Sequence, residues 1–552
     1  MTAFVPSRTH ITLRANETNR TEVGLKNILT QGKADVNDPP VEWGKRGFLL
    51  EGADLSWMLA LMAAGLGLRL LYFSGFGLDD DQIFRGNIAF LLHRKSLTGD
   101  NVGYRLTWLL PAALSCKIFG LTELGMIFPI TATATLGIGL VYAFGKALWG
   151  RAGALIAALL LIVQPLDFAW STMLTNDVPL SFFSALSIFL MLRALDHEDS
   201  AWKLRLWILA GVSLWLAYNA KISAVFLAPA IALICWRNRR RLGSQFIGFL
   251  AAVGALFGAT TLVYYLFTGD PFTPYHAELR FQGLVGPEAP AHRLTSEWFW
   301  TYVKFLFFRD RLGDFLFSVH PHLLVVLAGA SRFLGIRTSR DVFWWFLLVF
   351  LGMQFNIQRA GEVWITGFRN IRHAHVFVYP LILLLTGYLV ELRLKRAKLF
   401  HAVLAILLGF SGWQSVSTAS KTHVAFADMR DGCGFLATLP QKVIYSDGKL
   451  PTWCFILEIR GRKWQFKELH SWDREKRKAE IATITSGYVV TGGGREPYYG
   501  CRDCVIRADE LSPSKWRLIK EFPGSAKPTP WRPEPLRIWE VRETQGEVGK
   551  PG

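Results

Sequence analysis

The chain of 552 residues is 51% hydrophobic and only 19% charged, whereas soluble domains carry about 25% charged residues. With a positive mean hydropathy of +0.26, this composition excludes an ordinary soluble protein and predicts a polytopic α-helical membrane protein. The formal net charge of +18 would suit nucleic acid, but membrane insertion explains most of the basic residues. Since the sequence has no zinc-finger, Walker or Rossmann pattern, we expect no nucleic-acid partner.

The chain begins with a polar segment, residues 1–52. Its first 45 residues lack the early apolar core that a cleavable signal peptide needs. We therefore expect a cytoplasmic N-terminal tail, with the first apolar segment, 53–73, acting as a signal anchor.

Residues 53–414 are expected to form one transmembrane module, because apolar windows long enough to cross a bilayer recur throughout them. About eleven spans are expected: 53–73, 125–145, 153–169, 177–195, 205–219, 221–236, 245–267, 315–334, 341–357, 374–392 and 398–414. Lys and Arg collect in alternate connections, as they do in cytoplasmic loops, and Arg237, Arg239 and Arg240 are an example. An odd number of spans then places the C-terminal region on the exported side.

Two connections on the exported side, 74–124 and 268–313, are too long to be simple turns, and long ordered loops usually carry function. The first of them contains the apolar segment 104–120. Counting this segment as a span would invert every later loop and break the charge pattern. We therefore expect a helix lying at the outer interface of the bilayer, with Arg105 and Lys117 reaching to water.

The first outer loop carries three consecutive aspartates, Asp79, Asp80 and Asp81. Adjacent carboxylates repel one another, so at least one of them has reason to hold a raised pKa, as a general base working near neutral pH needs. A solvated acidic loop is the alternative interpretation. A further acid, Asp177, lies at the outer start of the span 177–195, where it could also serve only to cap a helix.

Several cations lie on the exported side, where membrane insertion alone would not place them. Lys221 sits at an outer turn between two spans and suggests an anionic partner, although a lysine at a helix end also snorkels to water. Arg369, Arg372 and His373 precede the span 374–392 and could bind phosphate or, less specifically, lipid headgroups. Carboxylates and cations on one face offer a base for a hydroxyl and partners for a departing phosphate.

Residues 415–552 are more polar and are expected to form a small extracytoplasmic α/β domain, from β-rich runs such as 487–491 and helical stretches such as 471–482. Four of the six cysteines lie in it: Cys433, Cys454, Cys501 and Cys504. An even number of cysteines in an exported segment fits disulfides. A structural zinc site is the alternative, although only one of the two pairs has Cys-x-x-Cys spacing.

The candidate acids and cations lie in four short motifs that follow one another along the chain: Asp80–Phe84, Leu174–Phe183, Asn219–Ser223 and Arg372–Pro380. They look like an acidic pair followed by an aromatic, a Thr-Asp-x-Pro-Leu-x-Phe-Phe stretch, a lysine before an apolar span, and an Arg-aromatic segment ending in Pro. Over about residues 53–400 the chain thus resembles the GT-C superfamily of membrane glycosyltransferases that use polyprenyl-phosphate-linked sugars. The resemblance is to the group of protein O-mannosyltransferases and lipid A aminoarabinose transferases.

The resemblance implies a GT-C-like helical fold and assigns roles to the candidate residues. Asp80 would be the general base that activates the acceptor hydroxyl for inverting attack at the anomeric carbon. Asp81 and Asp177 would orient the acceptor or stabilise the developing positive charge on the sugar, since glycosyl transfer passes through an oxocarbenium-like state. The polyprenyl phosphate would be held by a basic set consisting of Lys221, Arg369, Arg372 and His373. Family members differ in metal dependence, so no metal is assigned and a divalent ion stays open as a cofactor.

The chain departs from the family at Tyr104-Arg105-Leu106, where Pro-Pro-Leu is frequent, and Tyr104 and Arg105 are candidates on the acceptor side of the loop. The expected acceptor is a cell-envelope molecule, that is lipid A, another glycan, a protein or a lipid, at the cytoplasmic (inner) membrane, as in lipopolysaccharide modification. A transporter or flippase is one alternative, but it would place its ionisable groups near mid-membrane. A polysaccharide polymerase or ligase is another, and it would use an oligosaccharide pyrophosphate donor.

Overall fold

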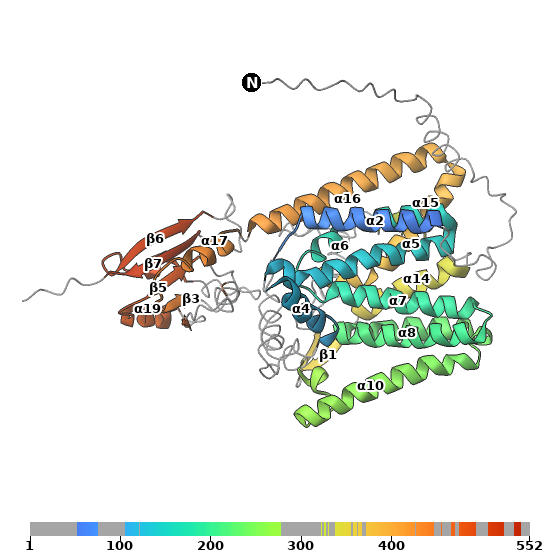
Figure 1. Ribbon diagram of the computed structural model, residues 1–552, viewed down its shortest axis with the longest axis horizontal. Coiled ribbons are helices and arrows are strands. Elements are labelled where there is room, and N and C mark those ends of the chain that lie inside the picture. Colours follow the sequence, from blue (N-terminus) through green and yellow to red (C-terminus); the bar gives the residue numbers. More distant parts are fainter. Residues whose placement is uncertain are drawn as a thin grey trace, which may run out of the picture.

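The computed structural model of the chain combines a helical bundle with a smaller α/β region that lies beyond one end of the bundle (Figure 1). It describes residues 52–75, 105–120, 122–277, 322, 325–326, 329–330, 337–354, 357–360, 363–366, 371–425, 427–446, 454, 465–469, 474–492, 506–523 and 535–542. The bundle contains the largest buried core, and the α/β region has cores of its own.

Helices make up the bundle, and most of the long ones run side by side along its length (Figure 1). They are α2 (Gly52–Leu71), α4 (Leu106–Phe119), α5 (Glu123–Ile162), α6 (Pro165–Trp170), α7 (Asp177–Asp196), α8 (Ser200–Ala220), α9 (Ala228–Arg237), α10 (Ile247–Thr268), α14 (Arg337–Gln354), α15 (Val378–Lys395) and α16 (Ala397–Ala425). The shorter elements are four 3-10 segments and one antiparallel strand pair: η1 (Ile222–Leu227), η2 (Arg239–Arg241), η3 (Ser244–Phe246), η6 (Ile371–Phe377), β1 (Ile357–Ala360) and β2 (Val363–Thr366).

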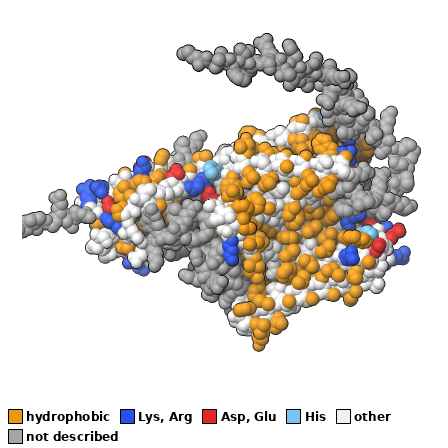
Figure 2. All heavy atoms as spheres, viewed as in Figure 1, with side chains coloured by type: hydrophobic (Ala, Val, Ile, Leu, Met, Phe, Trp, Pro, Cys, Tyr) orange, Lys and Arg blue, Asp and Glu red, His pale blue; other side chains and the backbone are white. Residues whose placement is uncertain are grey.

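Six helical segments in the described part of the chain are long and apolar enough to cross a membrane: Gly52–Leu71, Glu123–Ile162, Asp177–Asp196, Ser244–Thr268, Ala374–Lys395 and Ala397–Ser420. Hydrophobic side chains cover the visible side of the bundle, while charged ones gather near its ends and on the α/β region (Figure 2). These features indicate a multi-pass integral membrane protein, as the composition predicts. The count of eleven spans stays a prediction, because the expected span 315–334 lies largely outside the described residues.

Helix α5 contains two antiparallel limbs rather than one rod. Trp149 (φ −134°) and Gly150 (φ 72°) have non-helical backbone angles, and the positive φ favours glycine. A Cβ atom on Gly145 would lie 2.7 Å from the carbonyl oxygen of Gly153, whereas eight residues of a continuous helix span about 12 Å. The chain therefore reverses at this turn, and the limbs correspond to the expected spans 125–145 and 153–169.

The second of these expected spans is interrupted in the structure. Its helix ends at Ile162, and the short helix α6 begins at Pro165. Proline has no backbone N–H, and its ring clashes with the carbonyl group four residues earlier, so a proline inside a helix kinks or breaks it. Gln164 starts α6 by accepting a hydrogen bond from the backbone N–H of Asp167 (2.6 Å). The connection that follows α6, residues 171–176, is buried throughout.

Helix α4 occupies the segment that was expected at the bilayer interface. Its 14 residues extend about 21 Å, which is shorter than a hydrocarbon core of about 30 Å. One face is buried with Trp108, and Thr107 Oγ1 donates to the carbonyl oxygen of Leu216 on α8 (2.9 Å). The opposite face exposes Leu110 and Leu114. The helix is thus docked on the bundle by one side, and its depth in a membrane stays a prediction.

The α/β region follows α16, inside which the expected domain boundary at residue 414 falls. Its strands β3 (Ile444–Ser446), β4 (Phe466–Glu468), β5 (Tyr488–Thr491), β6 (Trp516–Phe522) and β7 (Leu536–Val541) form a mixed sheet in the order β4-β3-β5-β7-β6. Its helical elements are α17 (Ala427–Leu436), α19 (Arg474–Thr483) and η7 (Ala508–Glu510). Val490 packs in a core with Leu436 of α17, and Val489 packs in another with Ile481 of α19. The two faces of the sheet therefore carry separate cores.

One disulfide joins Cys433 of α17 to Cys454, with 5.0 Å between the Cα atoms. The bond leaves these two residues no free thiolate for a zinc site. Cys501 and Cys504 lie outside the described residues.

Candidate functional site

The structure describes the side chains of three of the predicted site residues of the bundle, Arg105, Asp177 and Lys221. Arg105 immediately precedes α4 and makes no side-chain capping bond to it. Arg372 and His373 lie in η6, where only the backbone is described. The remaining predicted residues, Asp80, Asp81, Tyr104 and Arg369, lie outside the described residues.

Asp177 and Lys221 form a buried ion pair. Lys221 Nζ donates to Asp177 Oδ1 over 2.6 Å, and the two side chains are 9% and 1% exposed, respectively. Helices α7 and α8 pack against each other and are joined by the short connection 197–199. The first residue of α7 therefore lies beside the residue that follows α8. Because removing two charges from water is costly, this contact depends on good geometry and additional hydrogen bonds.

Neighbouring polar groups supply such hydrogen bonds. Thr175 Oγ1 donates to Asp177 Oδ2 (3.1 Å), and Asn176 Nδ2 donates to the carbonyl oxygen of Ala220 (3.2 Å). The N-cap residue of α7 is Asn176, which makes no side-chain capping bond, so Asp177 is not a simple N-cap. Lys221 is only 7% exposed, so it does not extend into water as a snorkelling lysine would. The two charges instead form an ion pair with each other.

A second buried network was not predicted from the sequence. Arg69 Nη2 donates to Asp167 Oδ2 (2.6 Å), Arg69 Nε donates to Ser171 Oγ (2.8 Å), and His375 Nε2 lies 3.0 Å from Asp167 Oδ1. The side chains of Arg69, Asp167 and His375 are fully buried. A charged residue inside the apolar segment 53–73 is itself a signal of function, but the sequence does not identify its partner.

The end of α2 is fastened to the α6–α7 connection beside this network. Thr172 Oγ1 donates to Ser74 Oγ (2.8 Å), and the backbone N–H of Gly75 donates to the carbonyl oxygen of Thr172 (3.1 Å). Gly75 is the last described residue before the aspartate triplet, and Asp79 follows four residues later in the sequence. The residues that lead into the aspartate triplet are therefore hydrogen-bonded to the α6–α7 connection, and the same connection leads to Asp177.

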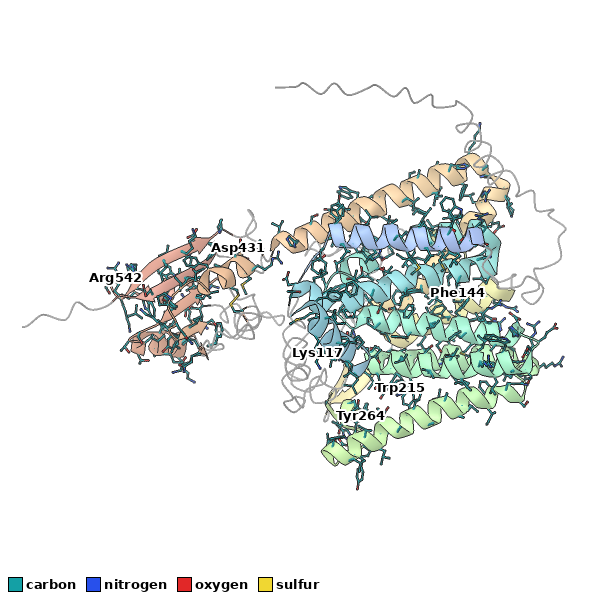
Figure 3. The ribbon with its side chains drawn as sticks, in the orientation of Figure 1. Lys117, Phe144, Trp215, Tyr264, Asp431 and Arg542 are labelled. Carbon is teal, nitrogen blue, oxygen red and sulfur yellow. A yellow bond between two sulfur atoms is a disulfide. The ribbon has the colours of Figure 1, made fainter. Side chains whose placement is uncertain are left out.

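The site end of the bundle faces the α/β region. Figure 3 labels Lys117 on α4, Trp215 on α8 and Tyr264 on α10 at this end, whereas Phe144 on α5 lies farther toward the opposite end. Trp215 Nε1 donates to Thr260 Oγ1 (2.9 Å), which holds α10 against α8. Indole and phenol side chains near a helix end are typical of a membrane–water interface.

Among the described residues, no group of three or more His, Cys, Asp or Glu side chains could hold a metal ion. Asp80 and Asp81 lie outside the described residues.

A family model described as dolichyl-phosphate-mannose-protein mannosyltransferase matches residues 106–265, a segment that contains both Asp177 and Lys221. A search of curated protein sequences finds no match.

Two solved structures share the fold. ArnT from Cupriavidus metallidurans bound to undecaprenyl phosphate aligns with a TM-score of 0.57 and 12% identity, over 90% of this chain and 99% of that chain. The Archaeoglobus fulgidus oligosaccharyltransferase tethered with an acceptor peptide aligns with a TM-score of 0.53 and 12% identity, over 79% of this chain and 69% of that chain.

Proposed function

Since the chain is a membrane glycosyltransferase of the GT-C superfamily, we propose that it transfers a sugar from a polyprenyl-phosphate-linked donor to a hydroxyl group of a cell-envelope acceptor. The acceptor is a lipid A, a glycan or a protein, and the reaction takes place on the exported face of the cytoplasmic membrane. The donor class is supported by the family description and by the undecaprenyl phosphate bound to the similar ArnT structure.

The observation that carries this proposal is the buried Asp177–Lys221 pair. An ammonium group held against a carboxylate can shift toward a phosphate without leaving the carboxylate bare, because Lys carries three donors. We assign Lys221 to the donor phosphate, together with Arg369, Arg372 and His373; the last two of these lie in η6. Cations placed where negative charge develops stabilise the transition state.

In the proposed reaction, Asp80 removes the proton from the acceptor hydroxyl as its oxygen attacks the anomeric carbon. The bond from that carbon to the phosphate oxygen breaks, and its electron pair leaves with the polyprenyl phosphate. A single displacement inverts the anomeric configuration. Asp81 and Asp177 orient the acceptor or stabilise the oxocarbenium-like sugar, and Tyr104 and Arg105 border the acceptor side of the loop.

The charges at the opposite end of the bundle support an exported site. There Lys146 and Arg151 lie on either side of the turn in α5, and both pair with Asp54. Arg151 Nε lies 3.5 Å from Asp54 Oδ1. Arg241 pairs with Asp196 (2.8 Å). Short cytoplasmic loops collect Lys and Arg, which favours a cytoplasmic location for this end and an exported one for Asp177 and the α/β region.

The lipid that co-purifies with the protein tests the donor class. Mass spectrometry of the detergent-purified protein is expected to detect a polyprenyl monophosphate, with or without one sugar. A polyprenyl pyrophosphate bearing an oligosaccharide would instead favour the polymerase or ligase alternative. Purification with phospholipids alone, after addition of excess undecaprenyl phosphate, would contradict the proposal.

A further inference from the structure

A continuous chain of buried polar groups leads from α2 to the Asp177–Lys221 pair. We infer that His375 is a positioning residue, which joins the Arg69–Asp167 ion pair to the first turn of α7 and so holds Asp177 against Lys221. This inference rests on the proposed function, in which Lys221 meets the donor phosphate. Nothing in the proposed reaction requires His375 to touch a substrate.

The two ring nitrogens of His375 contact different segments of the chain. Nε2 lies 3.0 Å from Asp167 Oδ1 on α6, and Nδ1 lies 2.6 Å from Ser181 Oγ on α7. Ser181 Oγ in turn lies 2.8 Å from the carbonyl oxygen of Asp177, one helical turn earlier. The imidazole thus bridges the α6 carboxylate and the backbone of the residue that pairs with Lys221.

Asp167 is itself held in place by hydrogen bonds, so it can fix one side of the His375 bridge. Its Oδ2 accepts from Arg69 Nη2 (2.6 Å), and its own backbone N–H donates to Gln164 Oε1 (2.6 Å). Arg69 is held in turn, because its Nε donates to Ser171 Oγ and its Nη1 donates to the carbonyl oxygen of Gly65 (3.1 Å). Every charged member of the network therefore has directional partners on more than one element.

The network consists of charged and hydrogen-bonding groups, which favours a role in positioning α7 over a role in stability. Apolar side chains of similar volume would fill this core with less desolvation, since buried ion pairs often contribute no net stability. Directional bonds, however, fix the first turn of α7 in a way that apolar packing does not. A misplacement of about 1 Å at a reacting group lowers the rate by about 10²-fold, so the position of this turn matters to the reaction.

A matched pair of serine substitutions on α7 tests the inference. Ser181→Ala removes the hydroxyl that links His375 to Asp177. Ser184→Ala removes a hydroxyl that is equally buried and has no hydrogen-bond partner among the described residues. Both changes keep the helix, because alanine is the strongest helix former.

We expect Ser181→Ala to raise the Kd for undecaprenyl phosphate about tenfold, as the loss of one hydrogen bond would, while Ser184→Ala leaves it unchanged. In the background of Lys221→Ala, Ser181→Ala should change the Kd by less than about twofold, because residues acting through one contact are not additive. Additive effects, or equal effects of the two serine variants, would assign His375 a merely structural role.

A second readout does not depend on the proposed function. Acetylation of Lys221 by acetic anhydride, followed by peptide mass spectrometry, reports how firmly the ammonium is held. We expect faster acetylation in Ser181→Ala and His375→Asn than in wild type, and no change in Ser184→Ala. If wild type fails to bind undecaprenyl phosphate while these rates behave as expected, the proposed function is wrong and the positioning role stands. Unchanged acetylation in both variants would overturn the positioning role itself.

Discussion

Asp80→Asn is expected to lower sugar transfer by about 10³-fold, within the range that general-base catalysis contributes, while the protein still inserts and folds. Asparagine is close in size to aspartate, but its amide cannot accept the hydroxyl proton. The measurement is turnover of the purified variant in liposomes, with thermal unfolding recorded in parallel to establish that the fold is retained.

Asp79→Asn is the matched control, because it removes the same charge from the neighbouring position of the triplet. We expect it to keep near-wild-type turnover. Equal losses in the two variants would indicate that the acidic loop acts only through its total charge. Wild-type turnover in Asp80→Asn would show that the base has been assigned to the wrong residue.

Lys221→Ala is expected to weaken both the fold and the binding of the donor. It leaves the Asp177 carboxylate, which is 1% exposed, without its ammonium partner, and breaking a buried pair in this way costs about 3–5 kcal/mol. Loss of the phosphate contact should raise the Kd for undecaprenyl phosphate by at least about 30-fold, the lower end of what truncating one buried charged partner does. The Kd or KM for the acceptor should change less.

A double variant separates the two effects. Lys221→Met combined with Asp177→Leu replaces the pair by apolar side chains, which often restores stability. We expect its melting temperature to recover toward that of wild type while donor binding stays weak. Lys117→Ala, which alters an exposed lysine at the same end of the bundle (Figure 3), should affect neither quantity. Recovery of donor binding in the double variant would refute a phosphate contact at Lys221.

The sequence motifs were sufficient to predict the superfamily and the enzyme class, and both are confirmed. The span pattern placed Asp177 and Lys221 on the same side, since the start of one span and the end of the next must lie there. Their contact, across 44 residues of sequence, is seen only in the structure. The turn in α5 was likewise predictable, because Lys146 and Arg151 mark a connection between spans.

Other features depend on information that one sequence does not contain. Arg69 and Asp167 are 98 residues apart, and each stands alone in an apolar stretch, so only the packed structure identifies them as partners. The interruption at Pro165 could have been predicted from proline chemistry, but the apolar run around it conceals the boundary. The parallel and antiparallel pairings of the small sheet depend on non-local contacts that its short strands do not encode individually.

Sugar transfer from defined donors is the most direct test of the central claim. The purified protein in liposomes would be given a panel of synthetic undecaprenyl-phosphate hexoses, pentoses and uronic acids, together with an envelope extract as acceptor. We predict release of undecaprenyl phosphate with at least one of these donors, and a product whose anomeric configuration, read by NMR, is the inverse of that in the donor. No release from any monophosphate donor, with turnover of a pyrophosphate-linked oligosaccharide instead, would contradict the proposed function.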